Sequence, residues 1–361
     1  MHSIRESLLA LTGLIRRRNS VWAEKIAHRM LETIQRAARD DGEWNFEQFV
    51  YFRKCSKLPD LTCHPTGTSG RAIEALVLYY EATGDELAFQ LAERFARWHF
   101  EHSIHEDGTI AGIPNLDHTH SFLGTLRGLF LFGKLAGRRN YIDKVKRCYQ
   151  KTVRTMIKES GYSSHDIGYE KQQEPASAGD AAQLALWFAL DGSGSFLDDA
   201  ERIVRARILP SQVTKTPPLI PAGSGGDQYE RLEERVLGGF GGMHFLPHGG
   251  KRNTTDVTAA CLHTLADIYN HIVWKDASAI WILFHFTYAD RDIQIKECRG
   301  EAALLQIQSY TAKPLMIRIP GWVAEESLKV KINGEVKEVK PQEGFLRIPG
   351  RETVQFVEVA I

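Results

Sequence analysis

Carboxylate side chains gather in a stretch of the sequence that lies outside the predicted helices and could do acid–base chemistry. Its members are Glu159, Asp166, Glu170, Glu174 and Asp180, and a second group follows at Asp227, Glu230, Glu233 and Glu234. Hydrolysis of a glycosidic bond needs one carboxyl group that protonates the leaving oxygen and another that acts as base or nucleophile. Carboxylates on two neighbouring loops can meet at one end of a helical domain, so the side chains of both groups are candidates for these catalytic roles.

A histidine pair lies where a long loop ends and a helix is predicted to begin, at Asp117-His118-Thr119-His120. On a helix, side chains at this spacing point about 200° apart, so both rings could bind one metal only from extended backbone. Capping of the helix by Asp117, with a polar histidine face, is one interpretation. Hydrogen bonds to a sugar substrate are the other. We take Asp117, His118 and His120 as substrate-binding candidates, together with His165 from the acidic stretch.

The cysteines are widely spaced and form no Cys-x-x-Cys pair, so the sequence predicts neither a zinc knuckle nor a thioredoxin-like redox centre. They are Cys55, Cys63, Cys148, Cys261 and Cys298. We expect reduced and mostly buried thiols, which behave as small apolar side chains.

The segments that must position these side chains are helical up to about residue 275. Apolar residues recur every three or four positions in paired segments, and the pairs are joined by turns at Gly84, Gly137 and Gly192, at nearly equal intervals. Such an array of helical hairpins either runs open or closes into a ring. Long segments between the pairs favour a ring whose loops gather at one end. We therefore predict a mainly α fold, with an (α/α) barrel over residues 1–275 as the catalytic domain.

After residue 275 the apolar pattern alternates with a period of two, which is typical of strands. The expected strands are residues 279–288, 293–297, 302–309, 315–319, 328–332, 344–348 and 353–360. Asn333-Gly334 is a strong signal for a hairpin turn. Short strands at this spacing predict a C-terminal β-sandwich over residues 276–361, to which we assign an accessory role.

The charge balance and the hydropathy exclude two classes of partner. The chain has 45 basic and 45 acidic side chains, whereas binding of nucleic acid through its phosphates requires a basic excess. No window of 18 apolar residues could span a bilayer. The apolar run at residues 8–15 precedes its arginines, unlike a secretory signal. We expect a soluble cytoplasmic protein with no nucleic-acid or membrane partner. One exposed face of the β-sandwich could allow two copies of the chain to form a homodimer.

Several short stretches along the chain are similar to those of a known enzyme family. They include Arg318-Ile319-Pro320-Gly321-Trp322-Val323 and residues 330–334 after the helical region, and residues 70–76, 79–85 and 118–121 within it. These stretches resemble the proteins of glycoside hydrolase family 127, whose type is β-L-arabinofuranosidase and which belongs to the six-hairpin glycosidase superfamily. The resemblance implies an (α/α) barrel, the six-hairpin toroid, followed by a β-sandwich.

Catalysis in that family depends on a zinc-bound cysteine nucleophile, held by a Glu-x-Cys element and a Cys-Cys pair. The matching positions here are Glu174-Pro175-Ala176 and Ala260-Cys261, so alanine stands at two of the three cysteine positions. The resemblance implies that Glu174 and Cys261 are the candidates for metal ligands and that zinc is the cofactor to test. A structural zinc site usually has four ligands, so these two residues alone would leave the ion under-coordinated. Cys261 is therefore a candidate for the nucleophile or for a remaining ligand of the metal. The family's acid/base has Glu159, Asp166 and Glu170 as candidates.

The leading hypothesis is a glycoside hydrolase, β-L-arabinofuranosidase-like, whose substrate is a small oligosaccharide or glycoconjugate. The missing cysteines motivate a second hypothesis, a catalytically inactive relative that binds carbohydrate. A sugar lyase or epimerase on the same fold is the third, and it rests on fold analogy alone.

Overall fold

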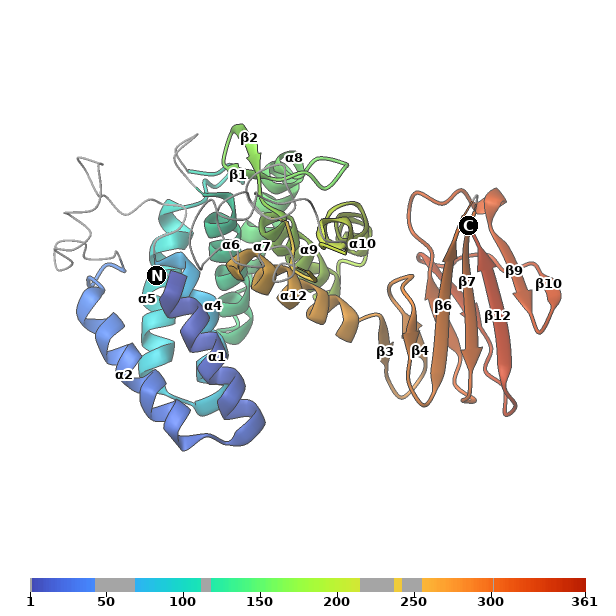
Figure 1. The fold of residues 1–361 in the computed structure, drawn as a ribbon, viewed down its shortest axis with the longest axis horizontal. Coiled ribbons are helices and arrows are strands. Elements are labelled where there is room, and N and C mark those ends of the chain that lie inside the picture. Colours follow the sequence, from blue (N-terminus) through green and yellow to red (C-terminus); the bar gives the residue numbers. More distant parts are fainter. Residues whose placement is uncertain (1, 43–68, 112–117, 215–236, 242–254, 301) are drawn as a thin grey trace, which may run out of the picture. The chain divides into compact units, whose positions relative to one another are not determined.

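The structure, a computed structural model, describes residues 2–42, 69–111, 118–214, 237–241, 255–300 and 302–361. The chain divides into two compact units, one formed by Met1–Ala181 and Ala206–Cys261 and the other by Ala182–Arg205 and Leu262–Ile361. The first, called the helical unit below, is mostly helical, and the second, the sheet unit, contains the larger sheets (Figure 1).

The helical unit is built from paired helices. Its helices are α1 (His2–Arg18), α2 (Val21–Ala37), α4 (Gly70–Thr83), α5 (Glu86–His102), α6 (Thr119–Leu135), α7 (Arg139–Cys148) and α8 (Arg154–Met156), with a π-helical segment at Tyr149–Val153. Consecutive helices pack together, α1 with α2, α4 with α5 and α6 with α7. Gly84 ends α4 with φ of +70°, and Gly137 has φ of +64° after α6. The predicted helical pairs around these two glycines are therefore confirmed.

Helices α4 and α6 approach each other closely, because glycine occupies the points of contact. A Cβ atom on Gly128 of α6 would lie 2.7 Å from Cβ of Ile73 on α4. A Cβ atom on Gly70 would lie 2.2 Å from Oγ1 of Thr125. This close approach brings the buried charged side chains of the two helices into contact, as described below.

A two-stranded hairpin occupies part of the acidic stretch, where the sequence predicts only a loop. β1 (Ser164–Asp166) pairs antiparallel with β2 (Tyr169–Gln173), and Gly168 at the turn has φ of +78°. His118, immediately before α6, forms a bridge to Asp166 (Figure 1). Strands of three and five residues are too short to show a period of two, which is why the pattern missed them.

Three elements continue from one unit into the other along the chain. They are α9 (Pro175–Leu190), a π-helical segment at Val204–Ile208 and α12 (Thr255–Asn270). Helix α10 (Phe196–Ile203) belongs to the sheet unit, and a short 3₁₀ helix at Leu209–Ser211 belongs to the helical unit.

The sheet unit contains one six-stranded and one four-stranded sheet. The first has the order β10-β9-β12-β7-β6-β5 and the second β11-β8-β4-β3. Their bounds are β3 Val273–Lys275, β4 Ile280–Ile282, β5 Tyr288–Ala289, β6 Ile293–Arg299, β7 Ala303–Ser309, β8 Leu315–Arg318, β9 Lys329–Ile332, β10 Glu335–Lys337, β11 Phe345–Ile348 and β12 Gln355–Ala360, with a 3₁₀ turn at Glu325–Ser327. All pairs are antiparallel except β4 with β8. Alternate apolar residues such as Ile295, Ile307 and Val357 are buried, as a half-exposed sheet requires.

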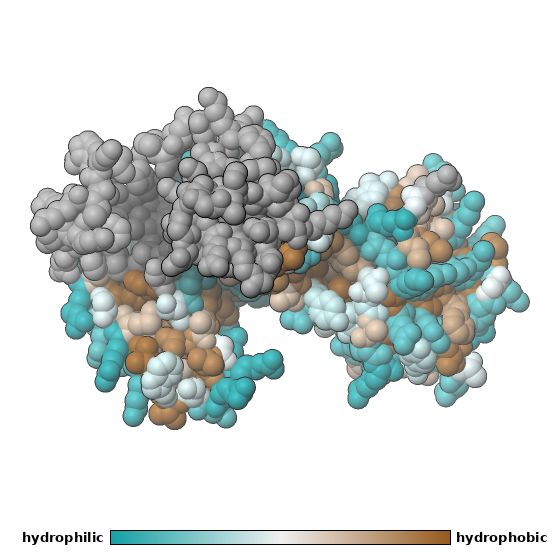
Figure 2. Space-filling view, in the orientation of Figure 1, coloured by the Kyte–Doolittle hydropathy of each residue, from teal (hydrophilic) through white to brown (hydrophobic). Residues whose placement is uncertain are grey.

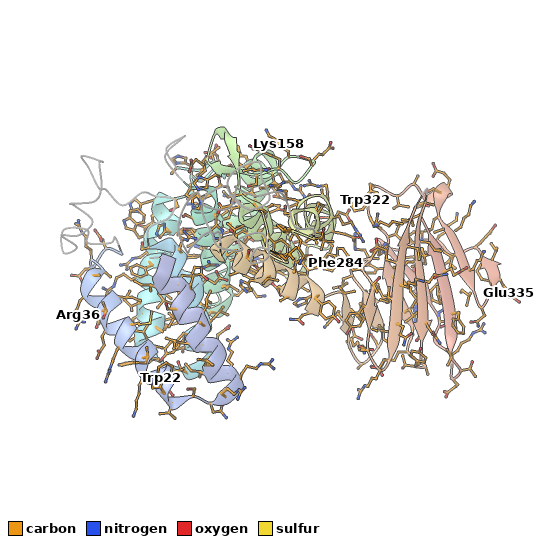
Figure 3. All side chains as sticks on the ribbon, viewed as in Figure 1. Trp22, Arg36, Lys158, Phe284, Trp322 and Glu335 are labelled. Carbon is orange, nitrogen blue, oxygen red and sulfur yellow. The ribbon has the colours of Figure 1, made fainter. Side chains whose placement is uncertain are left out.

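Most of the expected strands are present, and one of them is divided. Residues 279–288 form β4 and β5, which lie in different sheets. The chain crosses from one sheet to the other between them, and Phe284 and His285 of the crossing segment are buried (Figure 3). The hairpin of β9 and β10 turns at Asn333 and Gly334, both with positive φ, which confirms the predicted turn.

Arg318, the first residue of the Arg-Ile-Pro-Gly-Trp stretch, has a structural role in the sheet unit. Its guanidinium is buried and pairs with Asp198 and Glu201 of α10, and its Nε donates to the carbonyl of Leu283 at 2.5 Å. Trp322 of the same stretch lies on the surface (Figure 3). This stretch thus fastens α10 to the sheet.

Within the described ranges, no helix has the length and apolar character that a bilayer crossing requires. The surface of the sheet unit seen in Figure 2 carries hydrophilic side chains with hydrophobic ones between them.

Candidate functional site

Glu174 and His118 are brought together by the hairpin and by the starts of two helices. The backbone N–H of Glu174 donates to the carbonyl of Ser163 at 3.0 Å, and α9 begins at the next residue, Pro175. Proline suits this first helical position, because its fixed φ is helical and no N–H is needed there. His118 has extended backbone, with φ of −81° and ψ of 120°, at the residue before α6.

His118, His165 and Glu174 form a cluster of three ligand-type side chains. One atom from each lies within 4.8 Å of the other two. Nε2 of His118 is 2.9 Å from Oε2 of Glu174, and the His118 and His165 rings have their centroids 4.3 Å apart. The side chain of Glu174 is 3% exposed, whereas those of His118 and His165 are 26% and 20% exposed. A buried carboxylate with two partly open imidazoles therefore faces one small space.

Among the described residues, one nitrogen of each of these imidazoles lacks a hydrogen bond of normal geometry. Nδ1 of His118 pairs with Oγ of Ser121 at 3.0 Å, but its Nε2 is unsatisfied despite its closeness to Glu174. Nδ1 of His165 is 2.8 Å from Oδ1 of Asp166 and is also unsatisfied. Buried polar atoms normally have partners, so two such atoms in one cluster point to a ligand.

Glu174 is ionised in this environment. Burial by itself would raise the pKa of Glu174, but the imidazole of His118, whose Nε2 is 2.9 Å from the carboxylate, holds the pKa below its ordinary value. Oγ of Ser177 also donates to Oε2 of Glu174 at 3.3 Å. An ionised carboxylate can act as base, nucleophile or metal ligand, and another group must donate the proton to a leaving oxygen.

A chain of buried charges lies next to the cluster and holds His120. Nδ1 of His120 is hydrogen-bonded to Oδ2 of Asp180, and Arg127 donates to the other oxygen of Asp180 at 2.6 Å. Arg127 also pairs with Glu74, which accepts from Arg5 at 3.0 and 3.2 Å. All five side chains are nearly inaccessible to solvent. They come from α1, α4, α6 and α9, so the chain connects four helices.

Burial, opposed by the charge of Asp180, sets the protonation of His120. Burial lowers the pKa of His120 against the opposing charge of Asp180. Burial alone would raise the pKa of Asp180, but His120 and Arg127 hold it well below its usual range. The imidazole is therefore neutral, and with Nδ1 donating to Asp180 its lone pair is on Nε2. The His118 and His120 rings lie 5.9 Å apart between centroids, which the extended backbone at His118 permits.

Arg71 adds a cation to this group. It is 8% exposed, and its Nη1 donates to Oγ of Ser121 at 3.0 Å, the same hydroxyl that contacts His118. Burial lowers the pKa of Arg71, and the charge of Arg5 acts in the same direction. Within the part of the chain that the structure describes, its Nε and Nη2 have no hydrogen-bond partner.

Cys261 is fully buried near the same carboxylates. Burial raises the pKa of its thiol well above the usual range, and the charges of Asp180 and Glu174 raise it further, while Arg207 opposes them. The surroundings thus favour the thiol form. Cys148, Cys261 and Cys298 are free, and Cys55 and Cys63 lie outside the described residues.

The other predicted residues fall in different places. Asp166 is on β1 beside His165, and Glu170 is on β2, where the structure describes the backbone only. Glu159 lies in the turn before the hairpin. Asp117 and the second acidic group, residues 227–234, lie outside the described residues.

The residues at the family's zinc positions do not fit that ion, whereas the histidine cluster does. Ala176 and Ala260 carry methyl groups, which cannot ligate, so the Glu-x-Cys and Cys-Cys positions offer only Glu174 and Cys261. His118, His165 and Glu174 offer two imidazoles and a carboxylate, the donor set of open zinc sites and of other three-ligand metal centres.

Sequence reasoning missed Arg5, Arg71, Glu74 and Arg127. Glu74 and Arg127 interrupt apolar stretches of α4 and α6, on helices with little polar surface. A charged residue in such a stretch indicates a buried pair, and this signal was available in the sequence.

Comparisons with known proteins give no match at the level of sequence. No protein-family model matches this chain. No curated protein matches it either.

Solved structures with a similar fold are carbohydrate-active enzymes. A β-arabinofuranosidase of glycoside hydrolase family 127 is 13% identical, with a TM-score of 0.53 over 99% of this chain and 70% of that one. The unsaturated glucuronyl hydrolase of Bacillus sp. GL1 is 15% identical, with a TM-score of 0.51 over 74% of each chain. The cellobiose 2-epimerase of Spirochaeta thermophila is 13% identical, with a TM-score of 0.50 over 74% of this chain and 70% of that one. The likeness to the β-arabinofuranosidase extends over nearly the whole of this chain, whereas the likeness to the other two enzymes covers about three quarters of it, and at these identities it is a likeness of fold.

Proposed function

We propose that this chain is a glycoside hydrolase acting on a small oligosaccharide or glycoconjugate. The observation that carries the proposal is the convergence of Glu174 with His118 and His165, next to His120, at one end of α6 and α9. The fold shared with glycoside hydrolases supports it. Activity on β-L-arabinofuranosides is the specific form of the proposal to test first.

The chemistry divides among the residues of the cluster. Ionised Glu174 serves as base or nucleophile, and Asp166 or Glu170 on the hairpin supplies the proton that the leaving oxygen takes up. His118 and His120 hold sugar hydroxyls through their ring nitrogens. Water adds to the anomeric carbon, so that one hydroxyl is formed on each product.

A divalent metal such as zinc would be held by His118, His165 and Glu174. When bound, it would polarise an oxygen of the substrate or of water. Glu174 would then be a ligand, and its role as base would pass to Asp166 or Glu170.

The architecture and the location belong to the same proposal. We place the helices in a six-hairpin (α/α) ring that ends near residue 275, followed by an accessory β-sandwich. A cytoplasmic location, the absence of nucleic-acid and membrane partners, and a homodimer stay predictions.

A panel of chromogenic glycosides that includes a β-L-arabinofuranoside tests the proposal. We expect hydrolysis by the wild type and a loss of at least about a hundredfold in kcat for Glu174→Gln, the lower end for a catalytic acid–base group. Glu32→Gln, on the exposed surface of α2, is the matched control and should keep wild-type activity. Zinc and a chelator added in parallel separate the two roles of Glu174. Full activity of Glu174→Gln would overturn its assignment.

An epimerase is the second candidate, and it is favoured by the state of His120. A neutral imidazole oriented by Asp180 can abstract a proton from the carbon next to a sugar carbonyl. Nuclear magnetic resonance in D₂O distinguishes the two enzymes, because an epimerase exchanges that hydrogen for deuterium without cleaving the glycosidic bond.

An inactive carbohydrate-binding relative is the remaining alternative, favoured by alanine at positions 176 and 260. Calorimetry would then detect sugar binding without turnover, and turnover of any glycoside would exclude it.

A further inference from the structure

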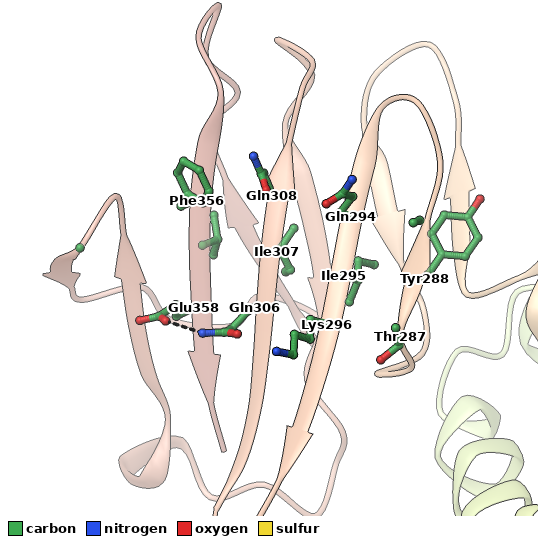
Figure 4. A pocket seen from close by; sticks show the side chains of 13 residues that line it. Thr287, Tyr288, Gln294, Ile295, Lys296, Gln306, Ile307, Gln308, Phe356 and Glu358 are labelled. Carbon is green, nitrogen blue, oxygen red and sulfur yellow. Dashed lines mark hydrogen bonds between the residues drawn. The ribbon is translucent and has the colours of Figure 1, made fainter.

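The outer face of the six-stranded sheet carries a second concave surface. A pocket of about 640 Å³ lies over β5, β6, β7 and β12, and its residues come entirely from the sheet unit (Figure 4). Its open side is formed by Gln294, Lys296, Gln306, Gln308, Phe356 and Glu358. Ile295, Ile307 and Val357, which alternate with these residues along the strands, also border the pocket and are themselves buried.

Strand register arranges the outward side chains in two rows across the sheet. Gln308 lies directly opposite Gln294 on β6 and Phe356 on β12, which forms the first row. Gln306 lies opposite Lys296 and Glu358, which forms the second row (Figure 4). Because neighbouring strands lie about 4.8 Å apart, each row spans about 10 Å. The surface is therefore long enough for more than one ring of a chain-like ligand.

The side chains of the rows offer hydrogen-bond donors and acceptors with little net charge. Each glutamine amide has two N–H donors and a carbonyl acceptor, and Lys296 and Glu358 carry opposite charges. Nε2 of Gln306 donates to Oε1 of Glu358 at 3.0 Å, which holds that pair in place. Among the described residues, no side-chain hydrogen bond joins Gln294 or Gln308 to a protein partner, so their amides are available to a ligand.

An aromatic ring lies at the end of the first row. Phe356 is 52% exposed, although it is in the interior of β12, between two paired strands. An apolar ring left in water is unfavourable until a partner covers it. Its closeness to glutamine amides matches a ligand that has an apolar face and hydroxyl groups around its edge.

The side chains of this surface suit some classes of ligand better than others. The core of a protein–protein interface is depleted of charged side chains, whereas this surface has Lys296 and Glu358 at the two ends of its second row. Nucleic acid would require several cations. A neutral saccharide has the C–H face that stacks on a ring and the hydroxyls that both donate to and accept from amides.

We infer that this sheet face is a binding site for a neutral oligosaccharide or polysaccharide chain, formed by Gln294, Gln308, Phe356 and the Lys296–Gln306–Glu358 row. This site lies outside the cluster around Glu174 and has no part in bond cleavage.

Affinity electrophoresis of the full chain in gels that contain arabinan, xylan, mannan or β-glucan tests the inference. At least one of these probes should retard the wild type, and calorimetry with its oligosaccharides gives the affinity. Phe356→Ala and Gln308→Ala should each weaken that affinity at least about tenfold. Trp322→Ala is the matched control, because Trp322 is 56% exposed and does not line the pocket.

Binding of a saccharide to the sheet face can be tested independently of the proposed catalysis. Glu174→Gln should still be retarded although its turnover is lost, and Phe356→Ala should hydrolyse a small chromogenic glycoside as the wild type does. Absence of retardation with every polysaccharide would overturn the inference, as would equal effects of Trp322→Ala and Phe356→Ala. A dimer that light scattering detects and Phe356→Ala dissociates would assign the face to a second copy of the chain instead.

Discussion

Nε2 of His118 lies 2.9 Å from Oε2 of Glu174, and this ring nitrogen makes no hydrogen bond of normal geometry with any residue that the structure describes. The two residues are far apart in the sequence. They meet because the β1–β2 hairpin bridges to His118 and leads directly into Glu174. With His165 on β1, they form a donor set for one metal ion.

Zinc binding should therefore depend on this cluster. We expect the purified chain to bind about one zinc ion, and His118→Ala or His165→Ala to lower the affinity by more than about tenfold, since losing merely a partner of a ligand costs roughly 10–100-fold. Metal analysis and calorimetry measure this without any substrate. His105→Ala, at an exposed histidine of the same unit, is the control. Zinc affinity that is unchanged in both cluster variants would exclude the site.

Removal of Arg127 should destabilise the helical unit strongly. Arg127→Met leaves the buried carboxylates of Glu74 and Asp180 with one cation fewer, and breaking a buried pair in this way costs about 3–5 kcal/mol in the free energy of unfolding. Arg16→Met breaks the exposed pair with Glu81 and an exposed hydrogen bond to the carbonyl of Leu78, and it should cost less than about 1 kcal/mol. Urea unfolding compares the two. Equal losses would show that the buried chain of charges contributes no more than a surface pair.

Two glycine substitutions should have opposite effects on stability. Gly128→Ala places a methyl group 2.7 Å from Cβ of Ile73, so α4 and α6 must separate, at about 1–3 kcal/mol. Gly13→Ala, on an exposed position of α1 with nothing within 4 Å, should stabilise by about 0.5–1 kcal/mol. Thermal unfolding of the two variants measures whether each substitution lowers or raises the stability. A neutral Gly128→Ala would mean that the two helices pack less tightly than described.

The stability of the sheet unit should fall as the pH falls below 7, in part because of His285. Burial lowers the pKa of His285 in the folded chain, against the charge of Glu201. In the unfolded chain its pKa is about 6.5, so between pH 7 and 5 the unfolded state takes up a proton that the folded state does not. His285→Gln removes this difference and should reduce the slope of unfolding free energy against pH by up to about 1.4 kcal/mol per pH unit.

The slope, and not the absolute stability, is the informative quantity, because His285→Gln also changes the hydrogen bond to the carbonyl of Arg318 at every pH. His105→Gln, at an exposed position, is the control for the removal of a histidine. A slope identical to that of the wild type would contradict the assignment.

Much of the secondary structure follows from local patterns that the sequence contains. The helical pairs around Gly84 and Gly137 and the turn at Asn333-Gly334 depend on periodicity and on residues that accept positive φ, so neighbouring residues suffice to predict them. The short strands β1 and β2 and the division of residues 279–288 do not, because they depend on pairing with distant segments.

The candidate site was predictable in its members but not in its arrangement. Residue types marked His118, His165 and Glu174 as candidates, since imidazole and carboxylate groups can do acid–base and ligand chemistry. Only the tertiary structure groups these three, and only it shows that His120 is paired with Asp180 and is buried deeply enough to lower the pKa of its imidazole. The physical reason is that protonation and ligand geometry depend on burial and on charges from helices far apart in the sequence, which no local pattern records.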